Sequence, residues 1–416
     1  MSQFLKVKTV DEVLEILRRI EPLEARLVDM EYARGRVLAE DLTASEPVPH
    51  FARAVMDGYA VHARDTFGAS ETLPALLSIG GEVSMGKAAL GRVEPGQAIA
   101  VPTGGMLPAG ADAVSMVEYT SFLDERTIEV TKPVAPGDNV LGVGEDIGVG
   151  EKLFPAGRRL RPQDIGVLAA LGITSIKVHR RPRVAILSTG DEIVPVSTRD
   201  LSPGKVRDIN ALTLAGQVEE AGGITVLRQI VPDDLSSLAS ACRGALDNHD
   251  VLLFSGGSSV GVRDYTLKIL DHFPDAELLV HGVAVRPGKP TILATIGKKL
   301  FWGLPGHPVS AMTVFEAFVR PSLQLLQGWK GAETIDALAS THSAILSRRL
   351  PSVHGRTDFV PVALSMGKEK LMAAPIFGKS ASINILGRAD GYVIVPEHVE
   401  GLDAGTDVEV RLYSRP

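Results

Sequence analysis

The sequence predicts a multidomain protein of the α/β and β classes, built around a central, doubly wound parallel sheet. Between residues 184 and 330, short apolar runs of strand length alternate with segments of helical periodicity, as in parallel α/β domains. Residues 46–148 are instead rich in Gly and Pro and contain only short apolar runs, which predicts an inserted β-rich domain. From about residue 333 the helical pattern stops and strand-like runs return, which predicts a small C-terminal β-barrel.

The composition indicates a soluble protein and excludes several classes. A chain of 416 residues is too long for one ordinary core. Hydrophobic residues make up 45% and charged residues 22%, which excludes an intrinsically disordered chain, and the net charge of −7 offers no basic face for nucleic acid. The sequence shows neither a secretion signal nor an apolar run long enough to span a membrane, so we expect a cytoplasmic protein that binds no membrane. The single cysteine, Cys242, excludes a disulfide framework and is interpreted as a core residue.

Each predicted element has a local reason. Thr9 begins an amphipathic helix through a Thr-Val-Asp-Glu capping box, and a second helix over 162–171 has Pro in its first turn and Gly172 at its end. In the α/β region, strands are predicted over 184–187, 225–231, 251–254, 278–285 and 299–302, and helices near 209–221, 234–246 and 263–273 and after 307. Further strands are predicted over 356–364, 371–377 and 405–413, within the barrel.

Three loops leave the carboxyl ends of predicted strands: "STGDE" (188–192), "SGGSSVG" (255–261) and "LPGHPVS" (304–310). Glycine lets the backbone approach a ligand closely, and the N-terminus of a helix offers unpaired N–H groups to an anion. Taken singly, each loop is also consistent with an ordinary turn. Because the carboxyl ends of parallel strands share one sheet edge, the three together favour a nucleotide or a phosphorylated ligand.

Carboxylates lie beside these loops: Asp191, Glu192, Asp233, Asp234 and Asp264. Bare carboxylates repel an anion, so a divalent cation between them is expected, and Mg²⁺ suits oxygen ligands. The alternative is that Asp233 and Asp234 cap the helix that follows them, which we expect of at least one. No group of His and Cys residues suggests a structural zinc site.

Further candidate residues lie outside the three loops. In "VRPGKP", Arg286 and Lys289 flank a rigid corner that suits two anionic groups, although a surface turn is the alternative. Asp57 in "MDGYAV" and Asp146 in "GEDI" are candidates to reach the ligand from another domain.

Taken in order, the motifs "MDGYAV", "PTGG…PAGADAV", "GEDI", "FPAG", "STGDE", "SGGSSVG…DYT", "RPGKP" and "GLPGHPVSA" resemble the MoeA family over essentially the whole chain. That family contains the molybdopterin molybdenumtransferases and the gephyrin E domain. The resemblance implies an enzyme of molybdenum cofactor biosynthesis that inserts molybdate into adenylylated molybdopterin, with Mg²⁺-dependent cleavage of the anhydride and release of AMP. It also implies a homodimer whose cleft draws on both subunits, and a contact with the molybdopterin adenylyltransferase is a further candidate.

The resemblance also implies an elongated subunit of four domains. Their expected bounds are 1–45 with 147–180 (linking and dimerisation), 46–146 (inserted, β-rich), 181–330 (α/β, MogA-like, molybdopterin-binding) and 331–416 (C-terminal β-barrel).

Carried over by motif, the functional residues form three sets. The catalytic acids fall on Asp57, Asp146, Glu192, Asp233 and Asp264, of which Glu192, Asp233 and Asp264 are the expected Mg²⁺ ligands. The substrate-binding residues fall on Ser255, Gly256, Gly257, Ser258, Arg286, Lys289, Pro305, Gly306 and Ser380. The sequence departs from some members at His281 and Arg286, where lysine is often found, and at His307, where "LPGNP" is common.

Other functions account for less of the sequence. The related molybdopterin adenylyltransferase is a single small domain, and a competence-damage-type pyrophosphatase leaves the first 150 residues without an explanation. A catalytically weak, molybdopterin-binding scaffold of the same fold is the alternative from a different class. The set of acids favours the enzyme.

Overall fold

The computed structural model describes residues 7–256, 261–332 and 340–413, with no side-chain description for residues 261–264 and 332. The chain divides into two compact units. One consists of residues 1–39, 157–160 and 176–416, and the other of residues 40–156 and 161–175.

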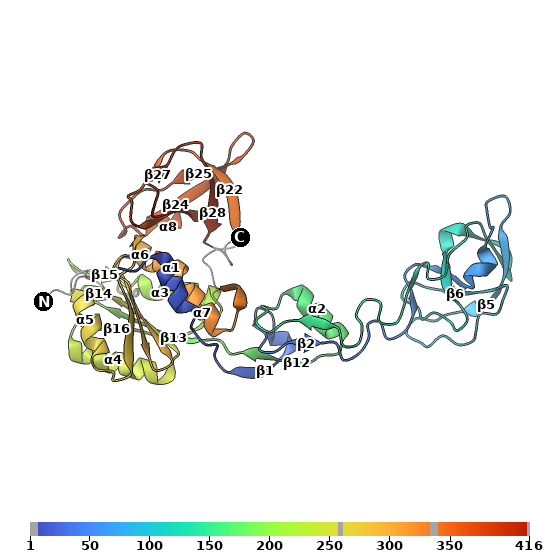
Figure 1. Cartoon of the computed structure of the whole chain (residues 1–416), viewed down its shortest axis with the longest axis horizontal. Coiled ribbons are helices and arrows are strands. Elements are labelled where there is room, and N and C mark those ends of the chain that lie inside the picture. The colour runs from blue at the N-terminus through green and yellow to red at the C-terminus, as the bar shows by residue number, and fades with distance from the viewer. Residues whose placement is uncertain (1–6, 257–260, 333–339, 414–416) are drawn as a thin grey trace. The chain divides into compact units, whose positions relative to one another are not determined.

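The first unit contains a six-stranded sheet in the order β16-β13-β17-β21-β20-β18 (Figure 1). The strands are β13 (Arg183–Thr189), β16 (Ile224–Val231), β17 (Val251–Gly256), β18 (Ala276–His281), β20 (Ile292–Ile296) and β21 (Lys299–Leu304). The pairs β16–β13, β13–β17 and β17–β21 are parallel, as predicted.

The predicted parallel sheet has an antiparallel edge. β20 was not predicted, and it pairs antiparallel with both β18 and β21. Ile296 and Lys299 are partners in the ladder, so β20 and β21 are joined by the two residues Gly297 and Lys298. A connection this short can join only antiparallel strands. The strand predicted over 278–285 also ends early, at His281.

Helices cover both faces of this sheet, as a doubly wound fold requires (Figure 1). Along β13, Val184 and Ile186 enter one core, while Ala185 and Leu187 enter the other, because successive side chains of a strand point to opposite faces. The first core also contains residues of α1 (Val10–Leu17), α3 (Asn210–Glu220), α6 (Pro308–Val314) and α7 (Arg320–Leu326). The second core contains residues of α4 (Leu235–Asn248) and α5 (Gly261–Leu270).

The predicted capping box at Thr9 is confirmed. The N–H of Glu12 donates to Thr9 Oγ1 at 3.2 Å, and the N–H of Thr9 donates to Glu12 Oε2 at 2.7 Å. The single long helix predicted after residue 307 is instead interrupted, because a five-residue π-helical segment, Phe315–Val319, lies between α6 and α7.

The C-terminal part of the first unit is a closed barrel of five strands, as predicted. They run in the order β24-β25-β22-β28-β26, and β26 pairs back with β24. Two of them, β22 and β26, were not predicted. The strands are β22 (Thr341–Leu346), β24 (Thr357–Met366), β25 (Leu371–Pro375), β26 (Gly391–Val395) and β28 (Asp407–Leu412). Short elements complete this unit: β1 (Ala25–Asp29), β12 (Ser175–His179), β14 (Ile193–Val194), β15 (Val206–Arg207), β19 (Val285–Arg286), β23 (Leu350–Pro351), β27 (Gly401–Leu402) and α8 (Asn384–Gly387).

The second unit is rich in strands, as predicted. Its six-stranded sheet has the order β7-β4-β6-β5-β9-β8. The strands are β4 (Gly58–Val61), β5 (Ala75–Glu82), β6 (Gln97–Val101), β7 (Ala113–Met116), β8 (Thr120–Asp124) and β9 (Thr127–Val130). Two small pairings, β2 (Leu42–Thr43) with β11 (Lys152–Phe154) and β3 (Arg53–Ala54) with β10 (Val140–Leu141), accompany them. The helix α2 (Pro162–Ala170) begins at its predicted proline, and Gly172 beyond its end has a φ of +67°. The exact bounds of four domains stay a prediction.

Over the ranges that the structure describes, no helix combines the length and the apolar character needed to cross a lipid bilayer.

A matched pair of substitutions tests the position of the core. Leu253 in β17 is fully buried, whereas Leu278 in β18 is 45% exposed. We expect Leu253→Ala to lower the free energy of unfolding by about 2–5 kcal/mol, because it removes packed methyl groups and leaves a cavity. Leu278→Ala should change it by less than about 1 kcal/mol. Urea denaturation followed by circular dichroism measures both, and equal effects would contradict the described burial.

Candidate functional site

The candidate site lies at the edge of the central sheet where four parallel strands end. Thr189 of β13 is the register partner of Val231 in β16 and of Gly256 in β17, and Ser255 of β17 is the partner of Leu304 in β21. The loops predicted to bind an anion therefore leave the sheet side by side. Of the substrate-binding residues in the Gly-rich loop, Ser255 and Gly256 are described, whereas Gly257 and Ser258 lie outside the described residues.

A buried asparagine that was not predicted joins two of these loops. Asn210, the first residue of α3, is 8% exposed. Its Nδ2 donates to Ser255 Oγ at 2.8 Å and to the carbonyl oxygen of Gly306 at 2.9 Å. Among the described residues, its Oδ1 has no hydrogen-bond partner. A polar residue at the start of a helix is ordinary in a sequence, so nothing local indicated that Asn210 bridges segments 45 and 96 positions away.

Carboxylates gather at the ends of β13 and β16, as predicted. Thr189 Oγ1 donates to Asp233 Oδ1 at 3.3 Å. Burial raises the pKa of Asp233, and repulsion from Asp191 and Glu192 raises it further, against a lowering by the Thr189 hydrogen bond. Gly190 has a φ of +147°, and a Cβ at this position would lie 2.6 Å from Glu192 Oε2. Glycine at position 190 thus leaves room for the Glu192 carboxylate.

The neighbouring acid, Asp234, is a helix cap. Asp234 Oδ1 accepts hydrogen bonds from the N–H of Ser237 at 2.9 Å and from Ser236 Oγ at 2.7 Å. The bond from the Ser237 backbone is the largest cause that lowers the pKa of Asp234 to about 2. The capping alternative is therefore confirmed for Asp234, while Asp233 faces the carboxylate cluster.

The oxygen ligands at this edge are of the type that Mg²⁺ binds. Glu192 and Asp233 supply carboxylate oxygens, which Mg²⁺ prefers, and their mutual repulsion is what a bound cation would relieve. Among the described side chains, no group of three or more His, Cys, Asp or Glu residues is arranged to hold a metal ion. The third expected ligand, Asp264, belongs to α5, but its side chain lies outside the described residues.

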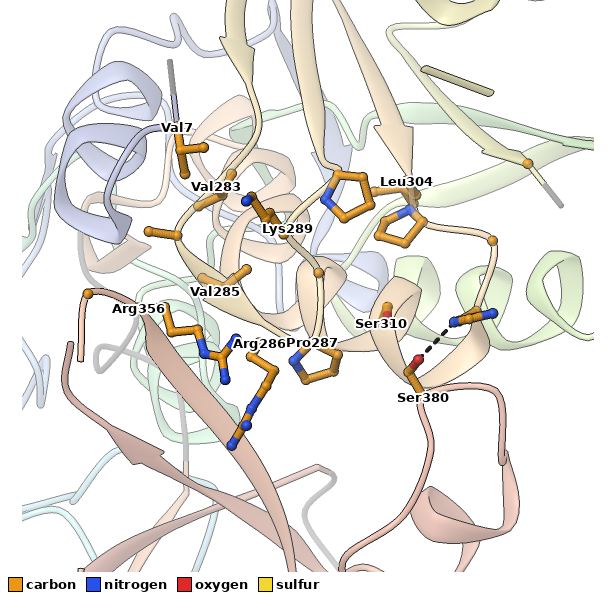
Figure 2. A pocket seen from close by; sticks show the side chains of 18 residues that line it. Val7, Val283, Val285, Arg286, Pro287, Lys289, Leu304, Ser310, Arg356 and Ser380 are labelled. Atoms are coloured by element: carbon orange, nitrogen blue, oxygen red, sulfur yellow. Dashed lines mark hydrogen bonds between the residues drawn. The ribbon is translucent and has the colours of Figure 1, made fainter. Parts of the chain in front are cut away.

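A cavity of about 560 Å³ opens beside the same edge (Figure 2). Its walls come from the corner around residues 283–290, the loop 304–307, and the barrel residues 355–356 and 380. It brings together six of the predicted substrate-binding residues: Gly256, Arg286, Lys289, Pro305, Gly306 and Ser380. Arg356 also lines it and was not predicted. Because Arg356 lies just before β24, in a segment with no motif of its own, only the fold places it here.

The two arginines of the cavity share one buried carboxylate. β19 (Val285–Arg286) pairs in parallel with β24, so that Arg286 is the register partner of Asp358. The Asp358 side chain is fully buried; it forms an ion pair with Arg286, lies 3.4 Å from Arg356 Nε, and accepts from Ser352 Oγ at 2.7 Å. Lys289 lines the cavity as a third cation. Among the described side chains, these three cations and Asp358 together give a net charge of two positive units. This balance suits a dianion.

Ser380 is held against the start of α6. The N–H of Val309 donates to the carbonyl oxygen of Ser380 at 3.2 Å, and His307 Nδ1 lies 2.8 Å from Ser380 Oγ (Figure 2). Both contacts come from the "LPGHPVS" segment, so this loop and the barrel together form one wall of the cavity.

The two remaining predicted acids, Asp57 and Asp146, belong to the second unit. Asp57 Oδ1 accepts hydrogen bonds from the N–H of Thr103 at 2.7 Å and from its Oγ1 at 2.8 Å, and these bonds lower the pKa of Asp57. Asp146 is exposed, and its N–H donates to the carbonyl oxygen of Val48 at 3.1 Å. Both carboxylates are therefore on the surface of their unit.

Three known protein regions and several named relatives match this sequence. Residues 8–172 match the MoeA N-terminal region (domain I and II), residues 185–325 match a probable molybdopterin binding domain, and residues 343–413 match the MoeA C-terminal region (domain IV). The sequence is 34% identical to a molybdopterin molybdenumtransferase of Bacillus subtilis, over 98% of this chain and 95% of the relative. It is 31% identical to molybdopterin molybdenumtransferase 2 of Mycobacterium tuberculosis, over 96% of each.

A solved structure agrees with the fold. The crystal structure of a molybdopterin biosynthesis MoeA protein from Pyrococcus horikoshii OT3 is 33% identical in sequence and superposes with a TM-score of 0.84, covering 98% of this chain and 100% of that one. Together with the sequence matches, this confirms the resemblance inferred from the motifs. The chain belongs to the MoeA family.

Proposed function

We propose that this protein is a molybdopterin molybdenumtransferase, which inserts molybdate into adenylylated molybdopterin during molybdenum cofactor biosynthesis. The observation that carries the proposal is the cavity with a net charge of two positive units, at the strand ends of the domain that matches molybdopterin-binding proteins. Relatives similar over nearly the whole chain have this name.

The cavity would bind molybdate. Molybdate is a dianion whose oxygens only accept hydrogen bonds, so it needs cations and donors. Lys289 and Arg356 would supply charge, and the Ser380 hydroxyl would supply a neutral donor. Arg286 would mainly form part of the cavity wall, because its guanidinium is already paired with Asp358.

The sheet edge would hold the anhydride of the adenylylated substrate. Asn210 joins Ser255, where the Gly-rich loop begins, to Gly306 of the "LPGHPVS" loop, and the Gly-rich loop is expected to hold the pterin phosphate. In the hydrolytic step, a water oxygen bonds to phosphorus, the bridging P–O bond breaks, and AMP leaves with the electron pair of that bond. Glu192 and Asp233, with Asp264, would hold Mg²⁺. When bound, Mg²⁺ neutralises the charge that builds up on the phosphate oxygens.

The remaining parts of the proposal concern partners. Asp57 and Asp146 would complete the site from the second subunit of a homodimer, since both are exposed carboxylates. The adenylylated substrate must be supplied by an adenylyltransferase, so a contact with that enzyme is part of the proposal. We expect all of this to take place in the cytoplasm.

A scaffold that binds molybdopterin without turnover is the second candidate. Incubation with adenylylated molybdopterin, Mg²⁺ and molybdate separates the two candidates. Release of AMP with formation of the molybdenum cofactor supports the enzyme, whereas binding without AMP supports the scaffold.

The molybdate assignment can be tested with two lysines. Lys289 lines the cavity, whereas Lys298 is 92% exposed and is paired with Glu21 at 3.3 Å. We expect Lys289→Ala to raise the KM for molybdate about tenfold, because it removes a charge-assisted hydrogen bond. The KM for adenylylated molybdopterin should change less than about threefold. Lys298→Ala is the control and should resemble the wild type; an unchanged KM for molybdate in Lys289→Ala would contradict the assignment.

The two adjacent aspartates separate catalysis from stability. Asp233→Ala should reduce AMP release at least about a hundredfold and remove its dependence on Mg²⁺, with little change in thermal stability. Asp234→Ala should keep AMP release but lower the melting temperature, because the cap of α4 is lost. The decrease in melting temperature should be largest at neutral pH. It should vanish as the pH falls toward 2, because Asp234 then becomes protonated in the wild type as well.

The same assay tests Asp264. Asp264→Ala should abolish AMP release from adenylylated molybdopterin without unfolding the protein. Normal AMP release from a folded variant would exclude Asp264 from the catalytic set.

A further inference from the structure

His307 occupies a position in the cavity that the proposed function leaves without a role. It is an exposed residue that precedes the first turn of α6 and lines the cavity with Arg286, Lys289 and Arg356. Its Nδ1 lies 2.8 Å from Ser380 Oγ. The backbone bond from Val309 to Ser380 holds the same two segments together, so the contact does not depend on one side chain alone.

The direction of this hydrogen bond decides what the serine can do. A serine hydroxyl has one proton to donate and two lone pairs to accept with. If Ser380 donates to a bare Nδ1, its proton is used and only lone pairs face the cavity. If Nδ1 carries a proton and donates to Ser380 Oγ, the hydroxyl proton is left to bind an oxyanion. Since molybdate offers only acceptors, only the second arrangement lets Ser380 bind it.

Protonation of the imidazole enforces that arrangement. Both nitrogens of the imidazolium carry a proton, so Nδ1 must then donate, and the ring adds a positive charge to the cavity. The charged groups that line the cavity opposite are cations: Arg286 and Lys289 from the corner after β19, and Arg356 from the barrel. Lys379 also precedes Ser380 in the chain. Among the described side chains, the carboxylate that contacts these cations is Asp358, which is buried and forms ion pairs with the two arginines.

We propose that His307 is a positioning residue for the oxyanion: as an imidazolium, which must donate from Nδ1, it makes the Ser380 hydroxyl a donor toward molybdate. Binding of the anion and protonation of His307 are then coupled, so each favours the other. The inference rests on the proposed function, because it takes molybdate as the ligand of the cavity.

The test is molybdate binding to the full-length protein by isothermal titration calorimetry at pH 6 and pH 8. Molybdate stays a dianion over this range, and Lys and Arg side chains stay protonated. We expect the Kd of the wild type to rise about tenfold between pH 6 and pH 8, with proton uptake visible as a dependence of the binding heat on the buffer.

Two asparagine variants make the test specific. In His307→Asn, an amide N–H can still donate to Ser380 Oγ but does not titrate, so the Kd should change less than about twofold between the two pH values. His342 in β22 is exposed and does not line the cavity, so His342→Asn is the matched control and should keep the wild-type pH dependence. Ser380→Ala should weaken binding most strongly at pH 6, where the hydroxyl is expected to donate.

Each result decides a different point. A wild-type Kd that does not depend on pH, or a His307→Asn variant that keeps the full dependence, would overturn the role of His307 and leave the molybdate cavity intact. No binding of molybdate by the wild type at either pH would overturn the cavity assignment itself, and the inference with it. The inference is supported if the Kd of His307→Asn stays nearly constant between pH 6 and pH 8 while the Kd of the wild type and of His342→Asn changes about tenfold.

Discussion

The cavity depends on one ion pair, between the exposed Arg286 of the α/β region and the buried Asp358 of the barrel. The parallel pairing of β19 with β24 makes these two residues register partners. A fully buried carboxylate is costly unless it is paired, and here it is bonded to Arg286 and Ser352 with Arg356 close by. Asp358 thereby positions two arginines side by side in the cavity wall, and its negative charge reduces the repulsion between them. This contact places Arg356 beside Arg286, while Ser380 is held separately by the backbone of Val309 and by His307.

The sheet edge gathers negative charge, whereas the cavity gathers positive charge. The barrel cavity gathers cations around one carboxylate, whereas carboxylates gather at the ends of β13 and β16. Among the described residues, the cation that contacts this cluster, Lys205, donates to the backbone carbonyl of Asp191 and not to a carboxylate. Burial and like charge raise the pKa of Asp233, which marks it as a group that lacks its counter-charge. An adjacent acid, Asp234, has its pKa lowered because backbone and hydroxyl donors surround it. Two carboxylates next to each other in sequence thus have different tasks, set by their surroundings.

Much of the fold could be predicted because its signals are local. The Thr9 capping box, the start of α2 at Pro162, and strands β13, β16 and β17 all follow from nearest-neighbour chemistry. The errors lie where pairing is decided at long range. β20 looks like any apolar strand, and only its two-residue connection to β21 makes it antiparallel. β22 and β26 carry weak patterns and become strands because the closed barrel supplies partners on both sides.

The sequence by itself determined the family, the three loops at the sheet edge and six of the residues that line the cavity, because these are carried by short motifs whose order along the chain is distinctive. Tertiary structure alone decided that Asn210 bridges two loops, that Arg356 joins the cavity, and that His307 meets Ser380. The reason is physical. A hydrogen bond or an ion pair needs atoms within about 3 Å, and residues 45 to 96 positions apart come that close only after the sheet and the barrel have formed.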